Sequence, residues 1–409
     1  MLTRSPYQHI WQILSDDKAM VFLAGPRQSG KTTLAKQIAA GFTNSIYCNW
    51  DIIEDRRTLL ENPAFFTAMK RRDSSLPLVV FDEIHKYRDW KNYLKGIYDR
   101  YAAEYRFLVT GSGRLDLYQR GGDSLAGRYL LFNLFPFTTA ELNAERPDFM
   151  TFQQNPLDLN ITNHEQRMAH WQQLEECSGF PEPFLKARPA SWRRWSGTYN
   201  RQLLREDIRD MSEIRQIDTM ESLFTLLPSR IGSPLSVAGL SRDLGVSYAT
   251  VQSWLALFEQ FFLTFSIPTW TDRIARAILK ERKVYLFDYP RITDPAARFE
   301  NQVALELLRG VTTWNNLGHG DFSLHFIKNK EQQEVDFLIV RERTPWLLIE
   351  AKLADEQPSQ SLLAMQKQLQ IPAIQLVKNS ISFRRFNTSN QQQVLVAPAC
   401  HWLSRLPFA

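Results

Sequence analysis

Along the first part of the chain, short apolar runs alternate with segments of helical pattern. Four of these runs have the length of a buried strand: residues 18–25, 45–51, 76–83 and 105–112. The intervening residues 31–40 and 89–102 predict helices, and the second places its apolar side chains on one face. Strands that alternate with helices form parallel sheets with right-handed crossovers. We therefore predict an α/β fold with a parallel-sheet domain over residues 1–150.

The pattern changes twice beyond residue 150. Residues 151–218 are helical in pattern, and we expect a helical linker or lid there. Residues 219–290 predict three helices and an apolar strand, which is the layout of a winged-helix domain. Residues 291–409 begin with a predicted helix near 296–309 and contain two apolar strands, VDFLIV and WLLIEAK. This mixed pattern predicts a second α/β domain in the C-terminal part.

The composition is that of a globular protein. Apolar residues make up 44% of the 409 residues and charged residues 23%, which excludes a disordered chain, a collagen-like fibre and a coiled-coil rod. No apolar run reaches the roughly 20 residues of a membrane-spanning helix, and the N-terminus lacks a signal-peptide core. The three cysteines form neither a disulfide framework nor a zinc-ligand pattern. We therefore expect a cytoplasmic protein with no membrane partner.

The clearest chemical motif is GPRQSGKTT at residues 25–33, directly after the first predicted strand. It matches G-x-x-x-x-G-K-[ST], in which a glycine loop turns backbone N–H groups toward phosphate and a helix begins beside the lysine. We expect Lys31 to neutralise the phosphates of ATP and Thr32 to coordinate Mg²⁺. The residues predicted to bind the nucleotide are Gly25, Pro26, Arg27, Gln28, Ser29, Gly30, Lys31, Thr32 and Thr33.

The run LVVFDE at residues 78–83 predicts the second half of this site. Asp82 would emerge at the carboxyl end of a buried strand and hold Mg²⁺, while Glu83 would orient the attacking water. Ser112 ends the next predicted strand and is either a sensor beside the γ-phosphate or a strand-end cap. Arg128 is a candidate arginine finger for a neighbouring subunit, and the alternative is a surface or salt-bridge residue.

A helix-turn-helix pattern occupies the middle of the chain, with Gly245 at the turn and Ser247 as the cap of the second helix. The net charge of +5 permits contact with nucleic acid. However, residues 246–263 contain no lysine or arginine, and phosphate neutralisation dominates such affinity. We therefore favour a winged helix that packs on protein over one that contacts DNA. Basic residues do cluster in 186–215 and 271–283, where a solvated face is the alternative to a nucleic-acid surface.

Acidic residues lie within the two C-terminal apolar strands, EVDFLIV and LLIEAKL. Asp336 and Glu350 lie 14 residues apart, and a hairpin at RERTP would place them side by side, with Lys352 on the same face as Glu350. Two carboxylates can share a hard cation, and a nearby lysine can activate water or stabilise a phosphate. Glu300, on the preceding predicted helix, could add a third oxygen ligand. The alternative is a surface salt bridge between these acids and the lysine.

The sequences of these motifs and their order along the chain resemble those of a large group of bacterial and archaeal AAA-type ATPases. The C-terminal domain of that group is similar to PD-(D/E)xK nucleases. The matching stretches cover most of the chain: GPRQSGKTTL, FDEIHK, LVTGSGRL, LAGRYLLFNLFPFT, SGFPEPF, LREDI, DLGVSYATVQSWL, KVYLFD, FENQVALELL, EVDFLIV and IEAKL. The resemblance implies an ATPase that works as a homo-oligomer. It also implies a restriction-endonuclease-like C-terminal domain with the three acids and the lysine at nuclease-type positions. Two residues depart from the group, because His85 replaces the usual glutamine and Gln252 a frequent lysine.

We therefore predict an Mg²⁺-dependent ATPase whose ATP cycle is coupled to a metal-dependent nuclease-like domain acting on DNA or RNA. The predicted catalytic residues are Lys31, Glu83, Ser112, Arg128, Asp336, Glu350 and Lys352. The predicted metal ligands are Thr32, Asp82, Glu300, Asp336 and Glu350. Two alternatives stay open: an ATP-gated oligomeric scaffold with a non-catalytic nuclease-like domain, and a DNA-binding regulator that uses the winged helix.

Overall fold

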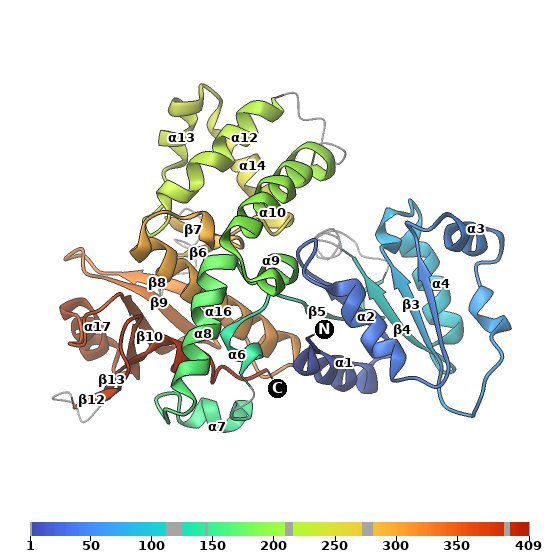
Figure 1. The fold of residues 1–409 in the computed structure, drawn as a ribbon, viewed down its shortest axis with the longest axis horizontal. Helices are drawn as coiled ribbons and strands as arrows, with labels where there is room; N and C mark the ends of the chain where they lie inside the picture. Colours follow the sequence, from blue (N-terminus) through green and yellow to red (C-terminus); the bar gives the residue numbers. More distant parts are fainter. Residues whose placement is uncertain are drawn as a thin grey trace. The chain divides into compact units, whose positions relative to one another are not determined.

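The chain forms two compact units, which Figure 1 shows as a ribbon. The computed structural model describes residues 2–111, 125–143, 146–208, 216–271, 281–387 and 393–408. The first unit comprises Met1–Phe135 with Gln260–Phe262 and Phe408–Ala409, and the second comprises Pro136–Glu259 and Leu263–Pro407. The finer division of the chain into four domains stays a prediction.

A parallel sheet of five strands, in the order β2-β3-β4-β1-β5, forms the centre of the first unit. Its strands are β1 (Met20–Ala24), β2 (Ser45–Asn49), β3 (Leu78–Asp82), β4 (Arg106–Thr110) and β5 (Leu130–Asn133). Every pairing is parallel, so the sheet predicted from the alternation of strands and helices is confirmed. Because β1 lies between β4 and β5, the loop after β1 emerges between two neighbouring strands.

Helices cover both faces of this sheet. They are α1 (Ser5–Asp17), α2 (Lys31–Ala40), α3 (Ile53–Glu61) and α4 (Trp90–Tyr101), with 3₁₀ turns η1 (Phe65–Ala68) and η2 (Ile84–Lys86). Alternate strand residues such as Phe22 and Phe81 pack with Trp90 and Leu94 of α4 in one apolar cluster. The other face of the strands contacts α1 and α2. The helices predicted at 31–40 and 89–102 are therefore confirmed within a residue or two.

The second unit begins with helices. In chain order they are α6 (Thr139–Leu142), α7 (Phe149–Gln154), α8 (His164–Cys177), α9 (Pro181–Lys186), α10 (Pro189–Gln202), the π-helical η4 (Leu203–Ile208), α12 (Ile217–Leu226) and the 3₁₀ turn η5 (Leu227–Arg230). Their aromatic side chains provide much of the local core. Trp195 stacks on Tyr199 with ring centroids 4.6 Å apart, and Phe180 packs against both rings. None of the described helices has the length and apolar character that crossing a bilayer requires.

The predicted helix-turn-helix follows, as α13 (Val237–Leu244) and α14 (Tyr248–Gln260), and leads into the antiparallel strands β6 (Thr264–Pro268) and β7 (Arg282–Leu286). Gly245 ends α13 with a left-handed φ of 64°, a conformation that favours glycine. The Ser247 hydroxyl accepts the Thr250 N–H at 3.1 Å and so caps α14. Both local predictions are confirmed.

The C-terminal part of the second unit is a six-stranded sheet in the order β12-β13-β11-β10-β9-β8. Its elements are η6 (Tyr289–Arg291), α16 (Pro295–Asn316), β8 (Phe322–Lys328), β9 (Glu334–Arg341), β10 (Thr344–Lys352), α17 (Gln360–Leu369), β11 (Ala373–Val377), β12 (Arg384–Asn387), β13 (Gln393–Pro398) and α18 (Ala399–Leu403). Strands β8, β9 and β10 are antiparallel, and α17 then crosses to β11, which pairs parallel to β10. The expected helix and strands are confirmed, and the restriction-endonuclease-like assignment stays a prediction.

A buried carboxyl group joins α16 to the start of α6. Glu306 is 3% exposed, and its Oε1 accepts the Thr139 N–H at 2.6 Å. Its Oε2 has no hydrogen-bond partner among the described residues. Burial therefore raises the pKa of Glu306 from the usual 4.5 to about 7, although the Thr139 N–H and the charge of Arg309 oppose the shift.

Glu306 makes the stability of the second unit depend on pH. Because its folded pKa lies above its unfolded value, the folded state holds an extra proton between pH 4.5 and 7, and stability falls as pH rises. Glutamine cannot lose a proton, so the unfolding free energy of E306Q relative to that of wild type should rise by about 3 kcal/mol between pH 4.5 and 7. Denaturant unfolding at several pH values measures the difference. The exposed Glu331→Gln is the control, and parallel curves for wild type and E306Q would contradict the prediction.

Candidate functional site

The phosphate-binding motif lies where the sequence predicts it, between β1 and α2. Gly25 through Gly30 form the loop, and Lys31, Thr32 and Thr33 begin the helix. Gly30 precedes α2 with a φ of 97°, a left-handed conformation that favours glycine. The N-terminus of α2, with its free N–H groups and positive dipole, therefore faces the space that the loop encloses.

Gly25 is required by a close approach of two backbone segments. A Cβ atom at this position would lie 2.3 Å from the carbonyl oxygen of Leu134, and the φ of Gly25 is 151°. The Leu134 N–H donates to the Ala24 carbonyl at 2.8 Å, which holds the two segments together. Any side chain here would push the phosphate loop away from the segment after β5.

A buried arginine braces the same loop. Arg4, which precedes α1 and is 2% exposed, donates through Nη1 to the Ser29 carbonyl at 2.9 Å. Its Nη2 donates to the Phe135 carbonyl at 2.8 Å. Arg4 could not be identified from the sequence, because an isolated arginine far from the motif carries no signal of its partners.

Lys31 lies within the loop it was predicted to serve. Its ammonium donates to the carbonyls of Gly25 at 3.0 Å and Pro26 at 2.7 Å. Burial lowers the pKa of Lys31 to about 8, although the nearby Glu83 and Asp82 favour the charged form. A phosphate oxygen in the loop would supply the anion that this buried cation lacks.

Asp82 ends β3 beside Lys31 and Thr32, as predicted. It is 1% exposed, and its carboxylate accepts hydrogen bonds from the hydroxyls of Thr32 at 2.9 Å, Tyr47 at 2.5 Å and Thr110. Thr32 and Asp82 thus present two oxygen ligands of the kind that Mg²⁺ takes. Tyr47 and Thr110 were missed. Part of their signal was available, because Thr110 ends β4 directly opposite Asp82, whereas Tyr47 lies in the middle of β2 and reaches Asp82 through its long side chain.

Glu83 follows Asp82 at the same edge of the sheet. Its backbone adopts a left-handed φ of 57°, and its N–H donates to the Thr110 carbonyl at 3.1 Å. The carboxylate lies 3.3 Å from the Lys86 ammonium and 3.7 Å from Nε2 of His85, which is 5% exposed. His85, where the resembled family has glutamine, therefore contacts the predicted catalytic carboxylate directly.

Two predicted catalytic residues of the first unit are not placed at the candidate nucleotide site by the structure. Ser112 lies outside the described residues. Arg128 makes a two-point ion pair with Asp99 on α4, through Nε at 2.6 Å and Nη2 at 3.1 Å. Within one chain Arg128 is thus engaged as the salt-bridge alternative expects, and its role as an arginine finger stays a prediction.

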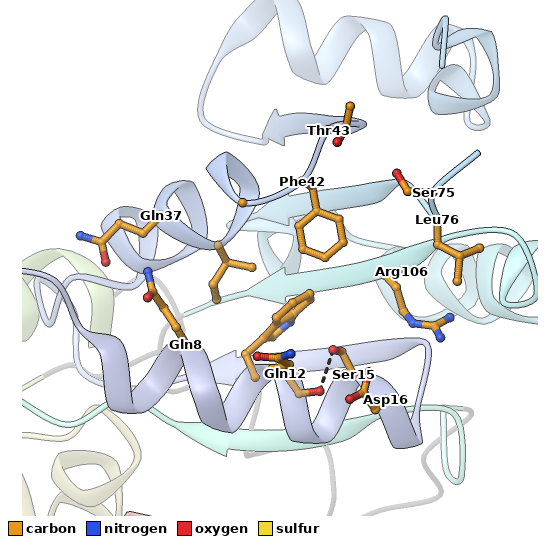
Figure 2. Close-up of a pocket in the computed structure, with 13 residues that line it drawn as sticks. Gln8, Gln12, Ser15, Asp16, Gln37, Phe42, Thr43, Ser75, Leu76 and Arg106 are labelled. Carbon is orange, nitrogen blue, oxygen red and sulfur yellow. Dashed lines mark hydrogen bonds between the residues drawn. The ribbon is translucent and has the colours of Figure 1, made fainter. Parts of the chain in front are cut away.

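A separate cavity of about 620 Å³ opens near the amino ends of the strands of this sheet (Figure 2). Its lining includes Gln8 and Gln12 of α1, Gln37 of α2, Ser75 before β3 and Arg106 at the start of β4. These positions mark the amino ends of the strands, whereas the phosphate loop lies at the carboxyl ends. The cavity is therefore distinct from the candidate nucleotide site.

The predicted C-terminal acids converge in the second unit. Strands β9 and β10 pair antiparallel with Phe337 opposite Ile349, which brings Asp336 next to Glu350. The Asp336 N–H lies 3.4 Å from Oε2 of Glu350, and the Ala351 N–H donates to Oδ2 of Asp336 at 3.0 Å. The predicted strand pairing is therefore correct.

Lysines balance these carboxylates. Lys352 lies 2.8 Å from Oε1 of Glu350 on the same strand face, as predicted. Burial, followed by the charge of Asp336, raises the pKa of both Glu300 and Glu350 above the usual range. Unlike a surface salt bridge, the cluster is largely enclosed, since the side chain of Glu350 is 4% exposed.

Two members of the cluster were missed, Lys283 of β7 and Glu334 of β9. The Lys283 ammonium lies 2.8 Å from Glu334, 3.1 Å from Glu300 and 3.5 Å from Asp336. Burial alone would lower the pKa of Lys283, but these carboxylates together raise it. In the sequence, Lys283 belongs to the basic run 271–283, and this charge run indicated a solvent-exposed or nucleic-acid-binding face rather than a buried lysine.

A second group of potential metal ligands joins α8 to α18. His164, Cys400 and His401 each offer a ligand atom, and these atoms lie within 4.8 Å of one another. However, Nδ1 of His164 and Nε2 of His401 are 2.9 Å apart and share a hydrogen bond. Burial and the charge of Arg167 lower the pKa of His401 to about 4. The same positive charge disfavours a bound cation, so we interpret the group as a hydrogen-bonded imidazole pair.

Family comparison supports an AAA-type P-loop domain in the N-terminal part of the chain. Residues 17–143 match the model of an AAA domain, and residues 168–289 match that of a domain of unknown function, DUF8612. The first match includes the phosphate loop, Asp82 and Glu83. The second spans most of the helical region and ends just after β7.

Individual relatives are distant. Uncharacterized proteins of Mycobacterium bovis and Mycobacterium tuberculosis are each 24% identical over 273 residues, which is 66% of this chain and 54% of theirs. The chain thus spans about half the length of these curated relatives. A Walker-type ATPase of Pyrococcus abyssi is 14% identical with a TM-score of 0.42, over 70% of this chain and 94% of that one. The Orc1 protein of Aeropyrum pernix, solved with DNA, is 14% identical with a TM-score of 0.29, over 74% and 93%.

We expect G25A to deform the phosphate loop. The added methyl group would overlap the Leu134 carbonyl, and the backbone strain should cost about 1–3 kcal/mol. Thermal unfolding and titration with a fluorescent ATP analogue measure the loss of stability and of nucleotide affinity. The control is G96A on α4, where a Cβ meets nothing within 4 Å and alanine favours the helix. Equal nucleotide affinity in G25A and wild type would contradict the prediction.

Proposed function

We propose that this protein binds and hydrolyses ATP, and that its ATP cycle is coupled to a metal-dependent nuclease-like domain acting on nucleic acid. The observation that carries the ATPase proposal is the contact between Thr32 and Asp82 at the edge of a parallel sheet, next to a buried Lys31. This arrangement supplies a cation for phosphate and two oxygen ligands for Mg²⁺ in one place.

The phosphate loop and the acids at the end of β3 have distinct roles in this proposal. Backbone N–H groups of the loop and of the first turn of α2 hold the phosphates. Lys31 exchanges its two carbonyl acceptors for phosphate oxygens. Thr32 and Asp82 would hold a Mg²⁺ ion, which would supply positive charge to offset that of the phosphates. Glu83 accepts a proton from the attacking water, and Lys86 and His85 keep its carboxylate near the strand end.

The C-terminal proposal is supported by topology and by chemistry. Helix α16 is followed by the antiparallel strands β8, β9 and β10, and the crossover α17 leads to the parallel strand β11, so the predicted helix and the two predicted strands that carry the acids belong to one α/β unit. Asp336, Glu350 and Glu300 would hold a divalent cation, and Lys352 would stabilise negative charge on a phosphate. The substrate would be DNA or RNA, bound by a homo-oligomer in which Arg128 exchanges Asp99 for a neighbour's phosphate.

A second candidate function is an ATP-gated scaffold whose C-terminal domain binds without cutting. The position of Lys283 favours it, because this ammonium already lies within 3.5 Å of three of the carboxylates and offsets part of their charge. A DNA-binding regulator has less support, since residues 246–263 carry no cation for phosphate.

We expect K31A to lose ATP binding and E83Q to bind ATP but hydrolyse it about 10²–10⁴-fold more slowly. The lysine supplies the cation for phosphate, whereas the glutamate acts only on the water. A binding titration and a phosphate-release assay separate the two effects. The exposed Lys70→Ala serves as the control. Normal turnover in either K31A or E83Q would refute the assigned roles.

Nuclease activity should depend on Asp336. We expect wild type to cleave at least one of duplex DNA, single-stranded DNA and RNA with Mg²⁺ or Mn²⁺. D336A should cleave none, because Asp336 lies beside Glu350 and also within 3.5 Å of Lys283. The assay is run with and without ATP, and the exposed Asp321→Ala should retain activity. Absence of cleavage by wild type under every condition would favour the scaffold.

A further inference from the structure

Lys283 is the most completely enclosed charge of the carboxylate cluster. Its side chain is 1% exposed, and its ammonium lies within 3.5 Å of three carboxylates, those of Glu300, Glu334 and Asp336. Such a cage of oxygens around one positive centre resembles the surroundings of a bound cation. A single carboxylate would balance the charge of a buried lysine, so three carboxylates are more than its charge requires.

Lys283 comes from a different part of the chain than the acids. It lies on β7, which pairs with β6 in a separate two-stranded sheet, whereas the acids lie on α16 and β9. The residues after β6 join the edge of β8, where the Trp270 N–H donates to the Phe326 carbonyl at 2.7 Å. Figure 1 shows β6 and β7 beside β8 and β9. The ammonium therefore enters the cluster from the side of β8.

The cluster has two halves that share Asp336. In one half, Lys283 lies among Glu300, Glu334 and Oδ1 of Asp336. In the other half, Oδ2 of Asp336 accepts the Ala351 N–H, the Asp336 N–H lies 3.4 Å from Oε2 of Glu350, and Lys352 pairs with Glu350. Each half contains a lysine, but the two lysines differ in enclosure. Lys283 is 1% exposed and fixed among three carboxylates, whereas Lys352 is 38% exposed and can leave Glu350 for solvent when a metal ion binds.

We propose that Lys283 is a resident cation that occupies one of two cation positions, so that the cluster takes a single divalent metal ion on the Asp336–Glu350 side. This inference rests on the proposed function, in which these carboxylates hold a metal. It adds the number of ions and the residue that sets it, and it narrows the ligands of that ion to Asp336 and Glu350, with Glu300 paired to Lys283. Lys283 acts here as a positioning residue, because it excludes a second ion from the Glu300–Glu334 side and holds Asp336 for the first.

The test is a calorimetric titration of the full chain with Mn²⁺. Ions that bind wild type but not E350Q belong to the cluster, and we expect one per chain. K283Q should bind one ion more than wild type or bind Mn²⁺ about tenfold more tightly, because three carboxylates lose their ammonium. K283R, which keeps the charge, should behave as wild type. So should K378Q, which removes a lysine that pairs with Glu175 at 2.6 Å.

The outcomes separate this inference from the proposed function. If wild type binds one ion and K283Q binds with the same number and affinity, the inference is overturned and the metal site stands. If wild type binds none and K283Q binds one, Lys283 is the resident cation and the metal-dependent function fails. If neither binds, both are overturned.

Loss of Lys283 leaves buried carboxylates without a partner, which can prevent folding. The double variant K283Q/E334Q removes one of these acids with the lysine and keeps Glu300 and Asp336 as ligands. We expect it to show the same gain in Mn²⁺ binding, together with a rise in melting temperature on addition of Mn²⁺. A folded double variant that binds like wild type would also overturn the inference.

Discussion

Both candidate sites depend on one constraint, the cost of burying a charge without partners. In the first unit, Asp82 is 1% exposed and is stabilised by three hydroxyl groups from Thr32, Tyr47 and Thr110. In the second unit, the carboxylates of Glu300, Glu334 and Asp336 surround one ammonium. The neighbouring strands and helices therefore have to place the hydroxyl and ammonium donors within hydrogen-bond distance of the buried carboxylates.

The two sites solve this constraint with different donors. Hydroxyl groups leave the negative charge of Asp82 in place, so a divalent cation is still attracted to it. An ammonium offsets one of these charges, so the Lys283 side of the C-terminal cluster has less attraction for a second ion. This difference explains why the same chemical argument, carboxylates that hold a metal, is stronger for the phosphate loop than for the C-terminal sheet.

Much of the fold could be predicted from the sequence because local patterns determine it. The strands β1, β3 and β10 are apolar runs, α2 begins at the lysine of the motif, and Gly245 and Ser247 carry their turn and cap in their own chemistry. The pairing of Asp336 with Glu350 followed from one hairpin. In each case the partners are close in sequence or belong to a motif with fixed spacing.

What could not be predicted are partners that only the tertiary fold brings together. Arg4 lies 25 residues before the Ser29 carbonyl that it braces, and Lys283 lies 53 residues before Asp336. A charge run such as 271–283 is usually a solvated face, and that base rate misassigned Lys283, whose apolar neighbours on β7 are the better indicator. A lysine inside an apolar strand must find carboxylates once it is buried. The sequence KVYLFD therefore contained a signal for an acid cluster, although it could not identify the acids.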